Sequence, residues 1–269
     1  MAAASCYLTE HARDDALPTH RHAGAYASLV LHGDYVEASA DGPFACVPGT
    51  LVLHPAFHAH GDRFGRRGAR VLNLALPAGW APRQVRVLRV AMRLDAARRA
   101  FEHGGAGLQA LVADARPVAV EARGDWQAAF VQALADDDLP IARIARRCGV
   151  TAAYASRALR SAYGMAPQQL RRELRWRRAL DLLRGDAALA DVALRAGFAD
   201  QSHFCRTARA FSGLPPAMLR RQVKCVQDAT AAAAHAGGTM AAPPRPPGST
   251  TCATPLSPGM DWPATPLPA

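Results

Sequence analysis

A short segment near the end of the part of the chain expected to be ordered carries side chains suited to recognising a polar ligand. It reads AGFADQSHF, residues 196–204, and places a glycine turn before Asp, Gln, Ser and His. Asp200 is of the type that caps a helix start, because its carboxylate accepts hydrogen bonds from the free amides of the first turn. Gln201, Ser202 and Arg206 then lie on the outward side of that helix. Glutamine pairs with adenine and arginine with guanine, so the pattern is typical of a helix that reads base edges.

A second set of chemically capable residues consists of histidines in the first sixty positions. His20 and His22 form an HxH pair, and alternate residues of a strand point the same way, so both imidazoles could face one cavity. His54, His58 and His60 follow on the next loop or strand. Three imidazoles can hold a divalent metal and leave a position open, and we take His20, His22 and His60 as the candidate ligands. Two alternatives stay open: a pocket for a non-metal effector, or a structural role in hydrogen bonding.

The positive charge of the chain is concentrated in one third of its length. The formal net charge is +10, and residues 139–226 contain 17 lysines and arginines against 5 acidic residues. All but one of these 17 cations are arginine, whose forked guanidinium recognises phosphate and guanine. A basic domain separated from neutral neighbours is the electrostatic signature of a nucleic-acid-binding protein.

The elements that must position these residues follow from the apolar pattern. Strand-length apolar runs broken by Gly, Pro and Asp fill residues 20–76, with SADG at 39–42 as a hairpin turn. From about Val90 the apolar residues recur at three- and four-residue steps, which predicts helices. We therefore expect an α+β protein with a small β-barrel domain at 1–90, a helical linker at 91–124, a helical DNA-binding domain at 125–226 and a disordered Ala/Pro/Thr-rich tail at 227–269.

The basic domain contains one pattern twice, at residues 141–167 and 189–216. In each copy a small alanine lets two helices approach, and four residues later Gly149 or Gly197 makes a turn in which positive φ costs little. A capping Thr151 or Asp200 then starts a second helix. This is the pattern of a helix-turn-helix, whose second helix enters the major groove. The expected base-reading residues are Ala153, Ser156, Arg157 and Arg160 in the first copy and Gln201, Ser202, Arg206 and Arg209 in the second.

An arginine-rich helix of about 17 residues connects the two copies and should span roughly 25 Å. That length could hold the two recognition helices near one DNA turn apart, about 34 Å, so that both read one face of a duplex. We expect some of its arginines to be solvated and one or two to touch phosphate.

Residues 139–221 resemble the AraC-type family of bacterial transcription regulators. The resemblance lies in GFADQSHF, the arginine that follows it, GLPP, and the matching first copy. It implies a seven-helix domain with two helix-turn-helix units, promoter binding, and contact with RNA polymerase if the protein is an activator. Ala155 and Ala208 depart from the family, which commonly has larger apolar residues there, and predict looser packing of the recognition helices.

The N-terminal half is similar to the cupin-type effector domain common in that family. The segments that carry this likeness are PTHRHAGAYASLVLHGDY and VPGTLVLHPAFHAHGDRFG. The likeness implies a domain that senses a small molecule or forms a homodimer. Metal-bearing cupins have a glutamate about four residues after HxH, where this chain has Tyr26, and Glu37 comes much later.

Three classes of function remain to be compared. The first is a sequence-specific DNA-binding regulator that is not an enzyme. The second, a metal-dependent cupin enzyme with a helical appendage, leaves the basic domain unexplained, and no Ser-His-Asp, P-loop or GxGxxG signature is present. The third is an architectural, non-specific DNA binder, which the base-reading residue types argue against. The sequence contains no apolar run of about 20 residues, no secretory signal and no paired cysteines, so we expect a cytoplasmic protein with reduced thiols and no membrane partner.

Overall fold

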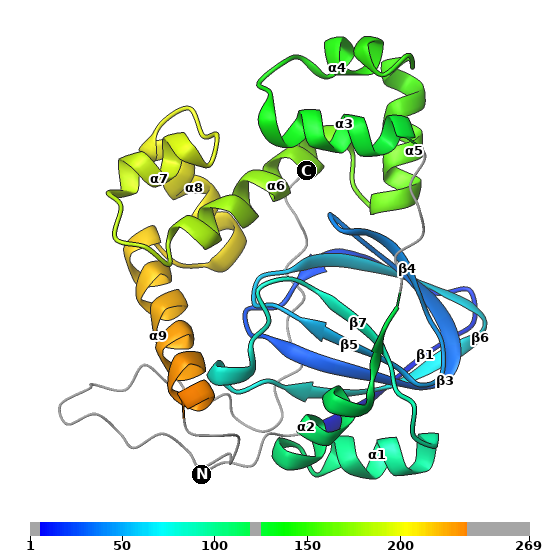
Figure 1. Ribbon diagram of the computed structural model, residues 1–269. Coiled ribbons are helices and arrows are strands. Elements are labelled where there is room, and N and C mark those ends of the chain that lie inside the picture. Colours follow the sequence, from blue (N-terminus) through cyan, green and yellow to red (C-terminus); the bar gives the residue numbers. More distant parts are fainter. Residues whose placement is uncertain (1–5, 119–124, 236–269) are drawn as a thin grey trace.

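The computed structural model describes residues 6–118 and 125–235, as an N-terminal sheet with flanking helices and a C-terminal group of helices (Figure 1). The strands are β1 (Cys6–His11), β2 (Ala16–Arg21), β3 (Tyr26–Ser39), β4 (Gly42–Cys46), β5 (Thr50–His54), β6 (Ala59–Ala75), β7 (Arg86–Arg89) and β8 (Arg116–Pro117). The helices are η1 (Ala78–Trp80), α1 (Leu94–Glu102), α2 (Gly105–Asp114), α3 (Asp125–Asp136), α4 (Ile141–Arg147), α5 (Ala152–Tyr163), α6 (Pro167–Leu182), α7 (Leu189–Arg195), α8 (Gln201–Ser212) and α9 (Pro216–His235). The predicted α+β class is confirmed.

The strands form one antiparallel sheet rather than a closed barrel. Its order is β1-β6-β3-β5-β7-β8, and β2 pairs with β6 while β4 pairs with β3. The two long strands β3 and β6 each pair with three neighbours, which brings residues far apart in sequence onto one surface. The path ends at β8, a two-residue edge strand whose Pro117 lacks a backbone donor for further pairing. The barrel expected from the sequence is therefore an open sheet.

Helices α1 and α2 belong to the sheet domain and do not form the expected linker. Phe101 of α1 and Leu108 and Leu111 of α2 are buried in one apolar cluster with Leu74 and Leu88 of the sheet. The strand β8 then rejoins β7, so the chain returns to the sheet within residues 91–124. The helical periodicity of this segment was read correctly, but the apolar face of a helix does not reveal which surface it covers.

Within residues 125–235 the structure has seven helices, α3 to α9, as the family resemblance implied. One core lies around Phe130, Ile144 and Leu159, and a second around Val192 and Phe204. Helix α6 contributes to both, because Leu170 packs in the first core and Trp176 in the second. The connecting helix thus holds the two halves of the domain together (Figure 1).

Both helix-turn-helix units have the turn and cap predicted for them. Gly149 and Gly197 have φ of 71° and 88°, a region that glycine occupies without strain. The Thr151 side chain accepts a hydrogen bond from the Tyr154 amide at 3.2 Å, and Asp200 accepts one from the His203 amide at 2.6 Å. The departures Ala155 and Ala208 are both fully buried.

The last helix runs further than the sequence pattern indicated. Helix α9 continues to His235, so the boundary expected at residue 227 falls inside a helix, and the rest of the expected tail lies outside the described residues. The segment after Gln227 is rich in alanine, the strongest helix former, so the helix can continue without a periodic apolar face. None of the described helices is long and apolar enough to cross a bilayer. The cysteines within the described part of the chain are free thiols.

Candidate functional site

Helices α5 and α8 each divide into a buried face and an exposed face that carries the predicted base-reading residues. Leu159 of α5 and Phe204 of α8 are fully buried against the domain cores. On the opposite faces, Ser156 is half-buried and the rest of the predicted set is exposed: Ala153, Arg157, Arg160, Gln201, Ser202, Arg206 and Arg209. These four arginines form no ion pair with any acidic residue in the described parts of the chain. Their guanidinium groups are therefore available to an external anion or base.

Several arginines of the connecting helix α6 have partners within the protein, and contact of this helix with phosphate stays a prediction. Arg171 donates to the Leu139 carbonyl at 2.6 Å. Ion pairs join α6 to acidic residues at the end of α3 and just after it, and to the hairpin between β3 and β4: Arg175–Asp138, Arg178–Asp136 and Arg177–Asp41. Part of the positive charge of the domain thus holds its own elements together.

A buried arginine of the sheet domain links it to the second helix-turn-helix unit. Arg21, at the end of β2, lies 2.8 Å from the Glu173 carboxylate of α6, and both side chains are almost completely buried. Its guanidinium also donates to the Phe57 carbonyl and lies 4.0 Å above the Phe211 ring of α8. Phe57, held at a φ of 60°, packs its ring against Trp176 of α6. The turn between β5 and β6 is therefore inserted into the core of the C-terminal domain.

The sheet domain also contacts the end of the first recognition helix. Thr19 donates to the Gly164 carbonyl at 3.0 Å, and Arg63 donates to the Ser161 carbonyl at 3.0 Å. Both carbonyls lie at the C-terminal end of α5, after Arg160, the last of its predicted base-reading residues. Both recognition helices are thus attached to one sheet through their ends or their buried faces.

The structure brings together the three histidines predicted as metal ligands. His20 of β2 lies opposite His60 of β6 in the strand register, with ring centroids 4.5 Å apart. His22 follows β2, and its ring centroid lies 5.5 Å from that of His60. One potential ligand atom from each lies within 4.8 Å of the others. The HxH spacing therefore identified a real cluster, and a metal at this cluster stays a prediction.

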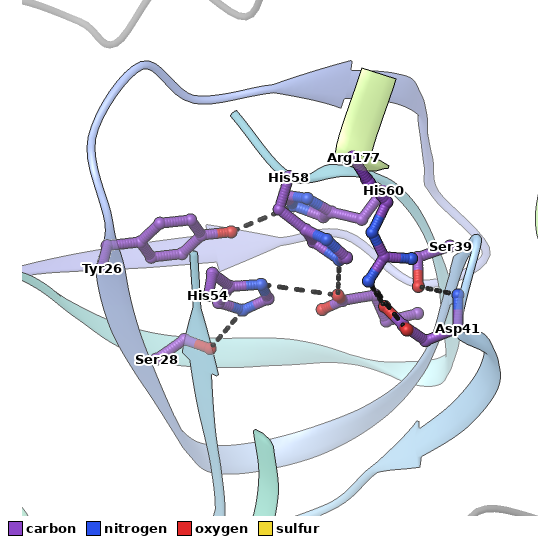
Figure 2. Close-up of polar contacts among 9 residues, drawn as sticks. Tyr26, Ser28, Ser39, Asp41, His54, His58, His60 and Arg177 are labelled. Atoms are coloured by element: carbon purple, nitrogen blue, oxygen red, sulfur yellow. Dashed lines mark hydrogen bonds and ion pairs between the residues drawn. The ribbon is translucent and has the colours of Figure 1, made fainter. Parts of the chain in front are cut away.

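A second cluster, which the sequence reading did not assemble, shares His60 and adds Glu37, His54 and His58 (Figure 2). The Glu37 Oε1 atom lies 3.6 Å from His54 Nδ1 and 3.9 Å from His58 Nε2. All four side chains are buried, none more than 4% exposed. Glu37 lies far from the HxH pair in the sequence, but β3 pairs with β6 along its length and places Glu37 opposite Asp62. The available signal was an acidic residue between the apolar residues Val36 and Ala38 of a strand.

Burial keeps the imidazoles of both clusters neutral. Burial, with some help from neighbouring histidines, lowers the pKa of His54 and His60 well below the ordinary value. Burial also lowers the pKa of His58 to about 3. Burial and the nearby Asp62 raise the pKa of Glu37 well above its usual range. Neutral imidazoles keep a nitrogen lone pair, the form in which histidine binds metals.

Two neighbours fix the orientation of these rings. The Tyr26 hydroxyl shares a hydrogen bond of 3.0 Å with His60 Nε2, and the Tyr26 ring stacks on His54 at 4.2 Å between centroids. His54 Nε2 lies 3.4 Å from the Ser28 hydroxyl, which leaves its Nδ1 directed at Glu37. Tyr26 therefore orients two histidines (Figure 2).

A cavity of about 570 Å³ opens next to the second cluster, between the sheet domain and helices α6 and α9. Phe57 and His58 form part of its wall, together with Asp41 and Arg177. Its volume falls within the range of small-molecule sites in proteins.

Comparison with known proteins identifies the C-terminal part of the chain. Residues 144–222 match the protein family described as "Helix-turn-helix domain". A search for similar curated proteins finds no match.

Solved structures give weaker likenesses. ToxT from Vibrio cholerae O395 is 9% identical over 81% of this chain and 97% of its own, with a TM-score of 0.39. A transcriptional regulator with an AraC-type DNA-binding domain from Chromobacterium violaceum is 26% identical over 36% of this chain and 88% of its own, with a TM-score of 0.33. A DNA-binding transcriptional dual regulator from Escherichia coli K-12 is 20% identical over 39% of this chain and 97% of its own, with a TM-score of 0.35.

Proposed function

We propose that this chain, whose residues 144–222 match a helix-turn-helix family, is an AraC-type transcription regulator that reads two successive major-groove segments of promoter DNA. One observation carries the proposal: each recognition helix buries one face in a domain core and exposes arginine side chains on the opposite face. Arg157 and Arg206 are exposed on the outward faces of α5 and α8 and form no ion pair within the described residues, whereas Arg175, Arg177 and Arg178 of α6 pair with acidic residues of the protein. Amide and hydroxyl groups beside Arg206 favour base reading over binding to phosphate alone.

Selection of bound sequences from a random DNA pool would give the preferred site, and dissociation constants of two variants then test the residues. We expect Arg157→Ala and Arg206→Ala each to cost about 1–3 kcal/mol on the selected site and much less on scrambled DNA. Affinity should also fall steeply with salt, because bound cations release counterions from the phosphates.

The control is Arg98→Ala, which removes the same charge from the exposed surface of α1 in the sheet domain. It should leave binding to both DNAs nearly unchanged. Equal losses on selected and scrambled DNA for Arg206→Ala would refute base reading at that position.

A small ligand is proposed to control DNA binding from the sheet side of the molecule. The cavity beside Phe57 and His58 supports this, because its wall combines residues of the sheet domain with Arg177 of α6. A ligand screen by thermal shift, followed by DNA-binding measurements with each hit, tests it. Hits that raise the melting temperature but leave DNA affinity unchanged would count against control from this cavity.

Homodimerisation through residues 1–138 and contact with RNA polymerase also belong to the proposal and derive from the family. Sedimentation of the full chain and transcription from a promoter with the selected site test them separately. A divalent ion on His20, His22 and His60 stays a prediction of the HxH pattern, and less than a tenth of an equivalent of metal in the purified protein would exclude it.

A further inference from the structure

The polar atoms of the second cluster lack the hydrogen-bond partners that buried groups normally have. Within the described chain, Glu37 Oε1, His54 Nδ1 and His58 Nε2 have no hydrogen-bond partner, and neither does His60 Nδ1. A buried polar atom left in this state costs roughly 1–3 kcal/mol, so four together in one place need an explanation. Glu37 Oε1 lies 3.6 Å from His54 Nδ1 and 3.9 Å from His58 Nε2, and both distances are too long for hydrogen bonds.

The spacing and chemistry of these atoms match a coordination shell. Ligands at about 2.0–2.2 Å from a tetrahedral zinc ion are themselves roughly 3.4 Å apart. The two separations from Glu37 exceed this by a few tenths of an ångström, and all four ligand atoms lie within 4.8 Å of one another. The set of three imidazoles and one carboxylate has the nitrogen and oxygen donors that zinc and its neighbours accept. Ser28 and Tyr26 supply the outer hydrogen bonds that orient ligating histidines.

We propose that Glu37, His54, His58 and His60 bind a divalent transition-metal ion of the zinc class. This site differs from the one that the HxH pattern indicated. It contains a carboxylate to offset the metal charge, and all four of its side chains are buried. In the HxH set, by contrast, the His20 Nδ1 atom already contacts the Pro18 carbonyl at 2.9 Å, and His22 is only partly buried.

The position of the ion connects it to the DNA-binding domain, a consequence that rests on the proposed function. His58 follows Phe57 directly, and Phe57 packs on Trp176 in the core that also contains α8. A bond from the ion to His58 would therefore fix the turn that enters the helical domain. Asp41 and Arg177 form a second connection at the same cavity, with both carboxylate oxygens 2.8 Å from the guanidinium (Figure 2).

Metal titration of the full chain tests the site without DNA. Protein stripped with a chelator is titrated with Zn²⁺ by calorimetry and with Co²⁺ by visible absorption, which reports coordination directly. We expect one ion per chain, and a loss of affinity of more than about 100-fold in Glu37→Gln and His58→Ala, since even outer-shell changes cost 10–100-fold. Glu37→Gln keeps the shape of the side chain, and thermal melting confirms that each variant is folded.

Two controls separate the alternatives. His32→Ala removes an exposed histidine from the same strand as Glu37 and should bind the ion as the parent does. His20→Ala and His22→Ala should keep the stoichiometry and the Co²⁺ spectrum. If they abolish binding while Glu37→Gln does not, the ion belongs to the HxH set and the proposal is wrong. Absence of binding in the folded parent chain would also overturn it.

DNA binding of metal-loaded and metal-free protein tests the connection to α8. We expect the two forms to differ in affinity for the selected site, and Phe57→Ala to keep the ion but lose the difference. If metal-loaded and metal-free parent protein bind the selected DNA with equal affinity, the connection to α8 is wrong, but the metal site itself is not contradicted. Failure of both forms to bind any DNA would instead refute the proposed function.

Discussion

At the scale of single residues, the same side-chain type performs opposite tasks in this protein. Arg157 and Arg206 extend from the recognition helices with no acidic partner among residues 6–118 and 125–235, whereas Arg21 is almost completely buried against Glu173. The sequence distinguishes these roles only where local signals exist. A capping residue and a turn place Arg206 on a recognition helix. No local sequence signal predicts that Arg21 pairs with Glu173 or that Arg177 pairs with Asp41.

Breaking the buried ion pair should destabilise the protein strongly. Glu173→Ala leaves the Arg21 guanidinium charged and largely without compensation in the interior, which typically costs about 3–5 kcal/mol. Urea denaturation measures the loss. The exposed pair Arg98–Glu102 provides the comparison, and Glu102→Ala should cost no more than about 1 kcal/mol.

The double change Arg21→Met and Glu173→Leu should recover most of the stability, because it removes both charges together. If Glu173→Ala costs as little as Glu102→Ala, the pair does not anchor the two domains.

At the scale of elements, the sequence predicted best where a structure is encoded locally. The helix-turn-helix units depend on a small alanine, a glycine with positive φ and a cap within a few residues, and all were found. The second cluster forms because β3 pairs with β5 and β6, and this pairing brings Glu37, His54 and His60 together across the sheet. The register between strands far apart in the sequence cannot be predicted from any single segment, so the sequence alone did not reveal the second cluster.

Removing the cap of the second recognition helix should affect stability and DNA affinity together. Asp200→Ala loses the bond to the His203 amide, which typically costs about 0.5–2 kcal/mol. The frayed first turn carries Gln201 and Ser202, so affinity for the selected site should also fall. Thermal melting and DNA titration of the same samples measure both.

Asparagine caps a helix as well as aspartate does, so Asp200→Asn should restore stability and affinity to nearly the parent values. A variant in which asparagine behaves like alanine would indicate that the negative charge, and not the cap, matters at this position.

At the scale of the whole molecule, the buried imidazoles make the metal-free fold sensitive to acid. Burial lowers the pKa of the five histidines of the two clusters, to about 4 for His22 and about 3 for His58. In the unfolded chain these groups take up protons below about pH 6.5, so the unfolded state binds more protons as the pH falls. Glu37 and Asp62 act in the opposite sense, because burial raises the pKa of Asp62 to about 7 and that of Glu37 well above its usual range.

Five imidazoles outnumber two carboxyl groups, so the free energy of unfolding should decrease from pH 7.5 to pH 5. The free energy of unfolding should change by about 1.4 kcal/mol per pH unit for each proton that the unfolded state binds in excess of the folded state. Urea midpoints measured with a chelator present give the slope. A stability that is constant or increases toward pH 5 would show that the histidines already carry protons in the folded state.

The attachment of both recognition helices to one sheet has a consequence for association with DNA. Thr19 and Arg63 hold the end of α5, while Arg21 and Phe57 hold the region around α8. The relative orientation of the two reading elements is therefore largely settled in the free protein, and less rotational freedom has to be lost on binding. The same rigidity makes the complex intolerant of spacing errors: a few base pairs inserted between the half-sites rotate one of them around the duplex, beyond the reach of a pair that cannot flex.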